Sequence, residues 1–478
     1  MTDHHRQFYI DGDWVAPISD EALDVINPAT EQAYATIALG NIADAERAIA
    51  SAKQAFPSFS RTHRAERVAL LTRILECYKD RMEDIARAIS DEMGAPLAMA
   101  RASQAQSGYD HIEATIAALA DFEFEEQRGT SRIRREPIGV VGLITPWNWP
   151  MNQIACKVAP AIAAGCTIVL KPSEVSPISG LVFAEIMHAA KVPPGVFNLV
   201  NGDGPTVGRV LSRHPDIDMI SFTGSTRVGI EVAKAAADTV KRVAQELGGK
   251  SANIILQDAD FVPAIENGVL ACLGNSGQSC DAPARMLVSA ERHDEALAIA
   301  RKTADAIKVG DPRAETTELG PVVSQVQFDK IQRLIGIGIA EGATLAAGGP
   351  GRPQGLNYGY YVRPTVFGHV KPDMTIAREE IFGPVLAIMP YATEDEAIRI
   401  ANDTPYGLAG YVQSTDIGHA RDVARQIRAG QIHINYPVAD LRAPFGGFKQ
   451  SGNGREYADW GLHDYLEVKG IIGFGVDT

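Results

Sequence analysis

The chain has 478 residues, 45% of them hydrophobic and 22% charged, which is typical of a globular protein large enough for more than one domain. Its formal net charge of −14 at pH 7 argues against general affinity for nucleic acid or anionic membranes. The charged start, MTDHHRQFYIDGDW, is unlike a signal peptide, and no apolar run approaches the length that spans a bilayer, so we expect a cytoplasmic protein.

The five cysteines are few and odd in number, which argues against a disulfide framework. The nearest pair in the second half of the chain, Cys272 and Cys280, lacks zinc-finger spacing and has no nearby histidine. We therefore expect no structural metal site.

The N-terminal quarter is predicted to be largely helical. Apolar residues at three- and four-residue steps predict one amphipathic helix over residues 64–93, which Gly94 and Pro96 end. Residues 44–56 and 103–119 are expected to form two further helices.

Beyond Pro137, short apolar runs alternate with segments able to form helices. The runs cover residues 138–145, 167–170, 196–200 and 217–222, and this alternation predicts a parallel, doubly wound sheet. A similar alternation restarts after Gly248 and Gly249 with a strand at 252–256 and helices over 261–273 and 293–306, which predicts a second α/β domain. Residues 464–475 alternate weakly and could form an edge strand that pairs with another subunit.

The segment ISFTGSTRVGIEVAKAA runs from a strand through a turn into a helix, and so presents free backbone N–H groups where a pyrophosphate could bind. It is not the GxGxxG fingerprint, and many such turns bind nothing. Gly224 and Gly229 would allow close approach of backbone and phosphate.

A second strand ends in VLKPSE, which places Lys171 and Glu174 at the carboxyl edge of the predicted sheet. Lys171 could hold a ribose hydroxyl, and the charge of Glu174 would repel a 2′-phosphate, which favours NAD over NADP. The alternative is a solvated pair of loop residues.

Cys280, in GNSGQSCDAPAR, has small and polar neighbours, unlike a cysteine used only for packing, and is a candidate nucleophile. The adjacent Asp281 should raise the pKa of its thiol unless the carboxylate points elsewhere. Glu246 precedes two glycines at the predicted domain junction and could act as a general base, or merely cap or face solvent. Asn148, in TPWNWP, could donate to an oxyanion, although asparagine is also a common turn residue.

Seven segments, in order and over nearly the whole chain, resemble the aldehyde dehydrogenase superfamily of the hydrolytic, non-CoA-acylating type. They are PIGVVGLITPWNWP, KPSE, FTGSTRVG, ELGGKSANII, GQSC, EEIFGPV and PFGGFKQSGNGRE. The resemblance implies oxidation of an aldehyde to an acid through a hemithioacetal and a thioester on Cys280, with water activated by Glu246. It implies Asn148 as an oxyanion donor and Lys157 as a lysine placed behind Glu246.

The resemblance also implies NAD as the preferred cofactor, with NADP possible, and Trp149 and Phe445 as substrate contacts. The cofactor residues that it implies are Ile144, Thr145, Pro146, Trp147, Lys171, Ser173, Glu174, Gly204, Gly208, Phe222, Thr223, Gly224, Ser225, Leu247, Gly248, Glu380 and Phe382.

The fold class implied is α/β, with a Rossmann-like doubly wound cofactor domain (residues 1–110 and 137–247), an α/β catalytic domain (248–442) and a small β oligomerisation extension. Residues 111–136 and 443–478 would bridge subunits of a homodimer or homotetramer.

Two other functions remain open: a CoA-acylating semialdehyde dehydrogenase, against which Glu246 argues, and a non-catalytic NAD-binding or structural relative. An aromatic wall of Trp147, Trp149, Tyr436 and Phe445 would suit aromatic or medium aliphatic aldehydes. Because arginine binds carboxylates, Arg442 leaves a carboxylate-bearing semialdehyde open as the substrate. The DAPAR sequence after Cys280 departs from the family pattern and puts transferred substrate assignments in doubt.

Overall fold

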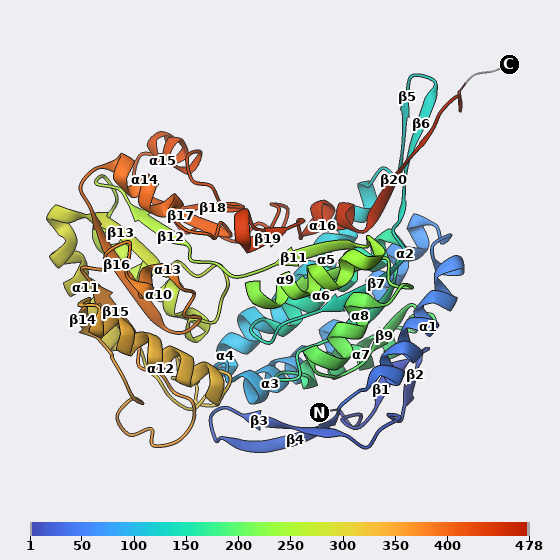
Figure 1. Cartoon of the computed structure of the whole chain (residues 1–478), viewed down its shortest axis with the longest axis horizontal. Coiled ribbons are helices and arrows are strands. Elements are labelled where there is room, and N and C mark those ends of the chain that lie inside the picture. Colours follow the sequence, from blue (N-terminus) through green and yellow to red (C-terminus); the bar gives the residue numbers. More distant parts are fainter. Residues whose placement is uncertain (1, 476–478) are drawn as a thin grey trace.

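A computed structural model describes residues 2–475 of the chain. Two α/β units lie side by side, each built on its own sheet, and a small β extension projects from the first unit (Figure 1). Within the described residues, no helix is both long and apolar enough to cross a bilayer. The predicted α/β class with a second α/β unit and a β extension is confirmed.

The first sheet has the strand order β19-β11-β10-β7-β8-β9-β1-β2. The run from β11 to β9 is parallel, and the strands at both edges are antiparallel. The strands are β1 (Phe8–Ile10), β2 (Asp13–Val15), β7 (Val140–Ile144), β8 (Thr167–Lys171), β9 (Phe197–Leu199), β10 (Met219–Thr223), β11 (Arg242–Glu246) and β19 (Gly452–Asn453). The central strands β7, β8 and β10 are buried throughout, which explains their nearly continuous apolar sequences.

Helices cover both faces of this sheet. The larger core contains α2 (Arg64–Asp80), α3 (Met82–Met93), α5 (Gln106–Asp121), α6 (Pro150–Ala164) and α7 (Ile178–Ala189). The smaller core contains α1 (Ile42–Phe59), α8 (Arg209–Arg213) and α9 (Thr226–Ala236). Every residue of α6 except Asn152 is buried, so this helix has no solvated face.

The second sheet has the order β14-β15-β16-β13-β12-β17-β18 and is parallel except for β14. Its strands are β12 (Ala252–Ile255), β13 (Arg285–Ser289), β14 (Thr344–Ala347), β15 (Thr365–Gly368), β16 (Val385–Tyr391), β17 (Ala409–Gln413) and β18 (Gln431–Ile434). One core contains α10 (Phe261–Leu273) and α11 (His293–Ala306). The other contains α12 (Gln325–Ala340), α13 (Thr375–Arg378), α14 (Glu394–Asn402) and α15 (Ile417–Ala424).

The two sheets meet at opposite ends of their strands. In the first sheet, Ile144 pairs with Lys171 and Thr223 pairs with Glu246, so the carboxyl ends of β7, β8, β10 and β11 share one edge. In the second sheet, Cys280 precedes β13 and Glu380 precedes β16, so both lie at amino ends. One cavity lies where the two sheets meet. It is lined by residues that follow strands of the first sheet and by residues that precede strands of the second sheet.

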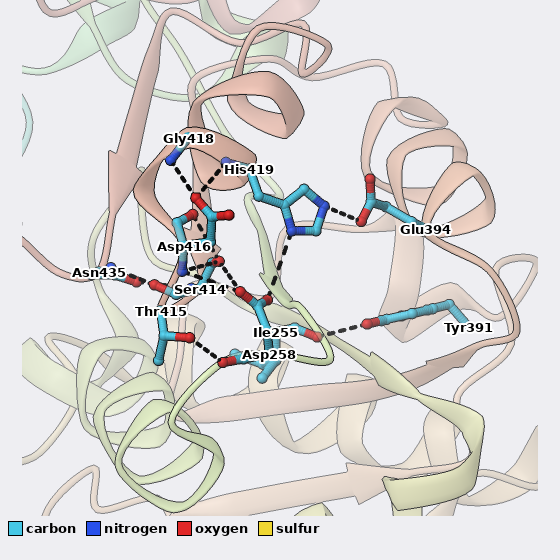
Figure 2. A network of polar contacts seen from close by, with 10 residues as sticks. All are labelled: Ile255, Asp258, Tyr391, Glu394, Ser414, Thr415, Asp416, Gly418, His419 and Asn435. Carbon is cyan, nitrogen blue, oxygen red and sulfur yellow. Dashed lines mark hydrogen bonds and ion pairs between the residues drawn. The ribbon is translucent and has the colours of Figure 1, made fainter.

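The carboxyl edge of the second sheet is tied together by polar contacts away from that cavity (Figure 2). Asp258, beyond β12, accepts hydrogen bonds from the Oγ of Ser414 at 2.6 Å and from the backbone N–H of Asp416 at 3.2 Å. One nitrogen of His419 lies 2.6 Å from the carboxylate of Glu394, and the other lies 3.8 Å from that of Asp258. These contacts join α14 and α15 to the end of β12.

The β extension consists of β5 (Glu125–Arg128), β6 (Ser131–Pro137) and β20 (Leu466–Ile471), in the order β20-β6-β5. Within the described chain, one edge of β20 pairs with β6 of the same chain, and the other has no partner strand. The remaining elements are β3 (Ala22–Asn27), β4 (Gln32–Ala38), α4 (Leu97–Met99), α16 (Ala458–Asp464), the π-helical η1 (Ala100–Ala105) and η2 (Gly204–Gly208), and the 3₁₀ turns η3 (Ala237–Thr239), η4 (Gly274–Gly277), η5 (Ala290–Arg292) and η6 (Lys449–Ser451).

The N-terminal quarter differs from expectation in two ways. Residues 8–38 contain four short strands, so this quarter is less helical than predicted. The prediction of a single helix over residues 64–93 was wrong. Arg81 leaves helical geometry (φ −109°, ψ 7°) and separates α2 from α3. The Arg81 guanidinium bonds Asp84 at 2.7 Å and Glu185 of α7 at 2.6 Å, which anchors the break to the neighbouring helix.

The proposed domain boundaries stay a prediction. Helix α5 crosses the boundary placed at residue 110 and contributes Ile112 and Leu119 to the first core.

Candidate active site

Cys280 lies in a closely packed loop between η4 and β13. Asn275, Ser276 and Gly277 have φ values of 53°, 54° and 70°. A Cβ atom on Gly277 would lie 2.0 Å from the carbonyl oxygen of Gly383, so this turn requires glycine. The small residues before Cys280 therefore shape the loop that presents it.

Asn148 is attached to the same loop. Its Nδ2 donates to the carbonyl oxygen of Gln278 at 3.0 Å, and its own carbonyl accepts from Nδ2 of Asn275 at 3.0 Å. The indole of Trp149 donates to Oγ of Ser279 at 2.8 Å. An amide NH₂ carries two hydrogens, so Asn148 keeps one donor beyond its bond to Gln278.

The surroundings of the Cys280 thiol favour its neutral form. Burial raises the pKa of this thiol well above its ordinary value, and the carboxylates of Asp281 and Glu246 add to the effect. The predicted influence of Asp281 is thus confirmed. Burial raises the pKa of Asp281 as well, against the opposing influence of His433. The thiol therefore requires a proton acceptor before it can act as a nucleophile.

Glu246 ends β11 and is only 4% exposed. Among the described residues, neither of its carboxyl oxygens has a hydrogen-bond partner. Burial, followed by the charge of Glu456, raises the pKa of Glu246 well above its ordinary value. A Cβ atom on Gly446 would lie 2.8 Å from Oε1 of Glu246, so the glycine leaves room for this carboxyl group.

Lys157 and Glu456 form a buried ion pair close to Glu246. Lys157, in α6, is fully buried; burial lowers the pKa of its ammonium group, but the carboxylate of Glu456 raises it further, so the net shift is upward. The thiol of Cys156 donates to Oε2 of Glu456 at 3.3 Å. Glu456 thus joins two consecutive side chains of α6.

A cavity of about 190 Å³ connects the two units at Cys280. Its lining residues are Pro146, Trp147, Asn148, Thr223, Gly224, Ser225, Leu247 and Gly248 of the first unit and Cys280, Gln327, Lys330, Glu380 and Phe382 of the second. Both units are therefore needed to build the site.

Glu380 and Phe382 are held at the border between the units. Glu380 accepts a hydrogen bond from the backbone N–H of Gly249 at 3.0 Å. Phe382 has a left-handed backbone (φ 58°), and its ring stands edge-on to Trp147 with centroids 5.4 Å apart. Gln327 Nε2 donates to the carbonyl oxygen of Phe382 at 2.6 Å, which stabilises this conformation.

Lys171 and Glu174 lie farther along the carboxyl edge. Lys171 Nζ donates to the carbonyl oxygens of Gly202 at 2.7 Å and Pro172 at 3.0 Å, and to the carboxylate of Glu174 at 3.0 Å. Nearby, Ser225 caps α9 by accepting from the N–H of Val228 at 3.4 Å.

Two aromatic side chains pack against each other beside Glu456. Phe445 stacks on Tyr457 with ring centroids 5.0 Å apart, and its backbone exchanges hydrogen bonds of 3.1 and 2.7 Å with Glu456. Tyr436, by contrast, accepts a hydrogen bond from Asn253 within the second unit, at 2.9 Å. Arg442 is exposed and bonded to Asp440 at 2.9 and 3.0 Å.

The family model described as the aldehyde dehydrogenase family matches residues 14–471. The chain belongs to the aldehyde dehydrogenase family. The predictions of family, fold class and enzyme class are confirmed, and this aldehyde dehydrogenase is an oxidoreductase with a catalytic cysteine.

Its relatives include proteins with known ligands. A 3-succinoylsemialdehyde-pyridine dehydrogenase of a Pseudomonas species is 53% identical over 471 residues, covering 98% of this chain and 99% of that protein. The crystal structure of aldehyde dehydrogenase C from Pseudomonas syringae, a cysteine-to-alanine variant with NAD+ and octanal, has 55% identity and a TM-score of 0.99 over 100% of this chain and 99% of that one. Betaine aldehyde dehydrogenase from Staphylococcus aureus, with NAD+, has 38% identity and a TM-score of 0.95, covering 99% and 98%.

The aldehyde dehydrogenase structure brings most predicted site residues to one region. Nine of the predicted cofactor residues line the cavity: Pro146, Trp147, Thr223, Gly224, Ser225, Leu247, Gly248, Glu380 and Phe382. The other eight lie along the first sheet beyond the cavity lining: Ile144, Thr145, Lys171, Ser173, Glu174, Gly204, Gly208 and Phe222. Of the expected aromatic wall, Trp147 belongs instead to the cavity beside Phe382, and Tyr436 is bonded to Asn253.

Sequence reasoning missed Glu456, Gln327, Lys330, Tyr457 and Gly446 as site residues. Glu456 and Gly446 stand in the motif PFGGFKQSGNGRE, which the sequence analysis used only for the family resemblance. Gln327 and Lys330 lie on α12, where no sequence signal separates them from other polar helix residues.

Proposed function

We propose that this aldehyde dehydrogenase oxidises apolar aldehydes, aromatic or medium aliphatic, to carboxylic acids with NAD+ as hydride acceptor and water as acyl acceptor. The observation that carries the proposal is the carboxyl group of Glu246. It is buried, has no hydrogen-bond partner in the described chain and is close enough to Cys280 to raise the pKa of the thiol. A base that activates water needs such a free carboxyl group, whereas a CoA-acylating enzyme would not require one.

The residues at the border between the units fit a nicotinamide dinucleotide. The hydroxyl groups of Thr145 and Thr223 are buried without partners in the described chain, and the N-terminus of α9 presents backbone N–H groups beside the cavity. Lys171 and Glu174 would hold the adenine-side ribose, and Glu380 the nicotinamide ribose. When bound, NAD+ accepts the hydride that leaves the substrate carbon. The two relatives with NAD+ in their structures support this assignment.

The chain's own groups perform the remaining chemistry. The Cys280 thiol loses its proton to a base and attacks the aldehyde carbon, and the free N–H of Asn148 with the backbone N–H of Cys280 stabilises the oxyanion. After hydride loss, a thioester remains on Cys280. Glu246 then takes a proton from water, which attacks the thioester and releases the acid. The Cys280 thiolate that leaves regains its proton from the base that first accepted it. Lys157 and Glu456 offer a route by which the proton on Glu246 can leave.

The substrate class rests on the aromatic side chains near Cys280. Trp149 is bonded to the catalytic loop, and Phe445 and Tyr457 stack beside Glu456. The guanidinium of Arg442 is exposed and paired with Asp440, and it is not among the residues that line the cavity at Cys280, which does not favour a carboxylate-bearing aldehyde. The octanal in one relative's structure and the pyridine in another relative's name are both consistent with an apolar or aromatic tail.

We further propose a homodimer or dimer of dimers formed through the β extension. In the described chain, the outer edge of β20 has no partner strand, and Val468 and Ile472 are 67% and 89% exposed. An unpaired strand edge with exposed apolar residues is suited to pairing with a second chain.

The experiment that tests the function is NADH formation by wild type, Cys280→Ala and Glu246→Gln over a panel of octanal, benzaldehyde-type aldehydes and semialdehydes, without CoA and with the product acids identified. Cys77→Ala is the matched control, since Cys77 is a free cysteine outside the site. We expect acid from wild type and Cys77→Ala, no turnover by Cys280→Ala, and a stalled thioester in Glu246→Gln.

Three outcomes contradict the proposal. Full activity of Cys280→Ala would show that Cys280 is not the nucleophile. A strict need for CoA establishes the acylating reaction. A clear preference for semialdehydes that Arg442→Ala abolishes overturns the apolar substrate class.

A further inference from the structure

Gln104 is a fully buried polar side chain beside the catalytic loop, and the chemistry proposed for Cys280 does not use it. It lies in η1, a π-helical turn between α4 and α5. The hydroxyl of Tyr78 donates to the carbonyl oxygen of Ala105 at 2.8 Å, which holds this turn against α2. Such π-helical turns are rare and occur frequently at functional sites.

The side-chain amide of Gln104 donates to two groups of the active site. Its Nε2 lies 3.1 Å from the carbonyl oxygen of Asn148 and 3.2 Å from Oδ1 of Asn275. An amide NH₂ carries two hydrogens, so each of these bonds has a hydrogen of its own. Gln104 therefore connects η1 with the loop before α6 and with η4, the turn that leads to Cys280.

Backbone carbonyl groups determine how these amides are oriented. Nδ2 of Asn275 donates to the carbonyl oxygens of Asn148 at 3.0 Å and Gln278 at 3.2 Å, so its Oδ1 is turned towards Gln104. Among the described residues, Oε1 of Gln104 has no hydrogen-bond partner, although a buried acceptor without a partner costs free energy. A polar group that is kept at such a cost requires an explanation, and a role in catalysis is one.

These contacts fix both the backbone and the side chain of Asn148. Its carbonyl oxygen accepts hydrogen bonds from Gln104 and Asn275, and its Nδ2 donates to the carbonyl oxygen of Gln278 at 3.0 Å. The second hydrogen on Nδ2 therefore has a defined direction. A donor stabilises an oxyanion most when it is held in place before the charge develops.

We propose that Gln104 is a positioning residue that holds the amide of Asn148 for the oxyanion formed when Cys280 attacks the aldehyde. This inference rests on the proposed function, in which Asn148 stabilises that oxyanion. Because Gln104 acts through Asn148, its loss should slow formation of the thioester and leave the reactivity of the Cys280 thiol unchanged.

The test compares the first-turnover rate of NADH formation, measured by stopped flow with octanal, in wild type, Gln104→Met, Asn148→Ala and the double variant. Methionine has nearly the size of glutamine and donates no hydrogen bond. Gln106→Met is the matched control, because Gln106 lies two residues farther along and bonds Asp110 of its own helix, at 2.7 Å. Gln104→Glu is a second variant, since burial favours the neutral carboxyl group, which donates one hydrogen.

We expect Gln104→Met to lower the first-turnover rate by up to about 100-fold, the effect of a displacement of about 1 Å at a reacting group. Gln104→Glu should lose less, and Gln106→Met should match wild type. In the Asn148→Ala background, Gln104→Met should have little further effect, because no amide is left to position. The rate at which iodoacetamide alkylates Cys280 should stay at the wild-type value in both Gln104 variants.

Three outcomes would overturn the inference while the proposed function stands. They are a wild-type rate in both Gln104 variants when Asn148→Ala is slow, the same fold-loss from Gln104→Met with and without the Asn148 amide, and an alkylation rate that falls with the turnover rate. A wild-type rate in Asn148→Ala would refute the oxyanion role itself, and with it this inference.

Discussion

Lys157 and Glu456 form an ion pair inside the first core although 299 residues separate them in the sequence. The pair lies close to Glu246, and the charges on both residues act on the pKa of that carboxyl group, in opposite directions. The C-terminal segment thereby completes a site whose other parts come from the middle of the chain.

Replacing Glu456 with glutamine should destabilise the protein strongly. The substitution leaves the ammonium group of fully buried Lys157 without its counter-charge, and breaking a buried pair in this way costs about 3–5 kcal/mol. Chemical denaturation of wild type and Glu456→Gln measures the change. Glu467→Gln is the control, because Glu467 is 58% exposed and pairs with Arg242 at the surface, where a pair contributes about 0–1 kcal/mol. Equal losses in the two variants would contradict the buried-pair interpretation.

The rate of thioester hydrolysis, plotted against pH, should have an acidic limb set by the pKa of Glu246. Burial raises the pKa of this carboxyl group, and only its ionised form accepts a proton from water, so the rate should fall as the pH drops through that raised pKa. The midpoint should therefore lie above about 4.3, the ordinary value for glutamate. Stopped-flow measurement of thioester decay against pH gives the limb directly. A midpoint at or below the ordinary value, or an unchanged limb in Glu246→Gln, would show that another group is the base.

Gly446→Ala should reduce turnover while leaving cofactor binding intact. The added Cβ would lie 2.8 Å from Oε1 of Glu246 and 2.7 Å from the carbonyl oxygen of Gly454, so the carboxyl group must move. A displacement of about 1 Å at a reacting group can reduce the rate about 100-fold. Steady-state kinetics and NAD+ titration separate the two effects. Gly336→Ala, where a Cβ meets no atom within 4 Å, should behave as wild type.

Glu174→Gln should improve the use of NADP+ relative to NAD+ by at least about 10-fold. The carboxylate would lie near a 2′-phosphate, and two like charges 4 Å apart repel by about 4 kcal/mol near a protein surface. Lys171 stays in place in this variant because the carbonyl oxygens of Pro172 and Gly202 also hold it. The ratio of kcat/KM values for the two cofactors is the measurement. An unchanged ratio would show that Glu174 does not discriminate between them.

Local signals in the sequence predicted the elements that depend on neighbouring residues. The helices expected over residues 261–273 and 293–306 have the same bounds in the structure, because the apolar spacing and the residues at their ends define them. The alternation of apolar runs and helices likewise predicted two α/β units, and spaced motifs identified Cys280, Glu246 and Asn148 as candidates. The helix break at Arg81 was not predicted, since the contact that Arg81 makes there with Glu185 of another helix leaves no trace in local periodicity.

Only the tertiary structure decided which of these parts meet. Periodicity shows how a segment folds but not the order of strands in a sheet, so it could not place the amino ends of β13 and β16 opposite the carboxyl ends of β7 and β10. Periodicity also could not predict that Glu456 lies beside Lys157 or that His369 lies beside His293. The sequence by itself determined the chemistry available to this aldehyde dehydrogenase, whereas long-range packing determined which groups act together, because burial and distance depend on the whole fold.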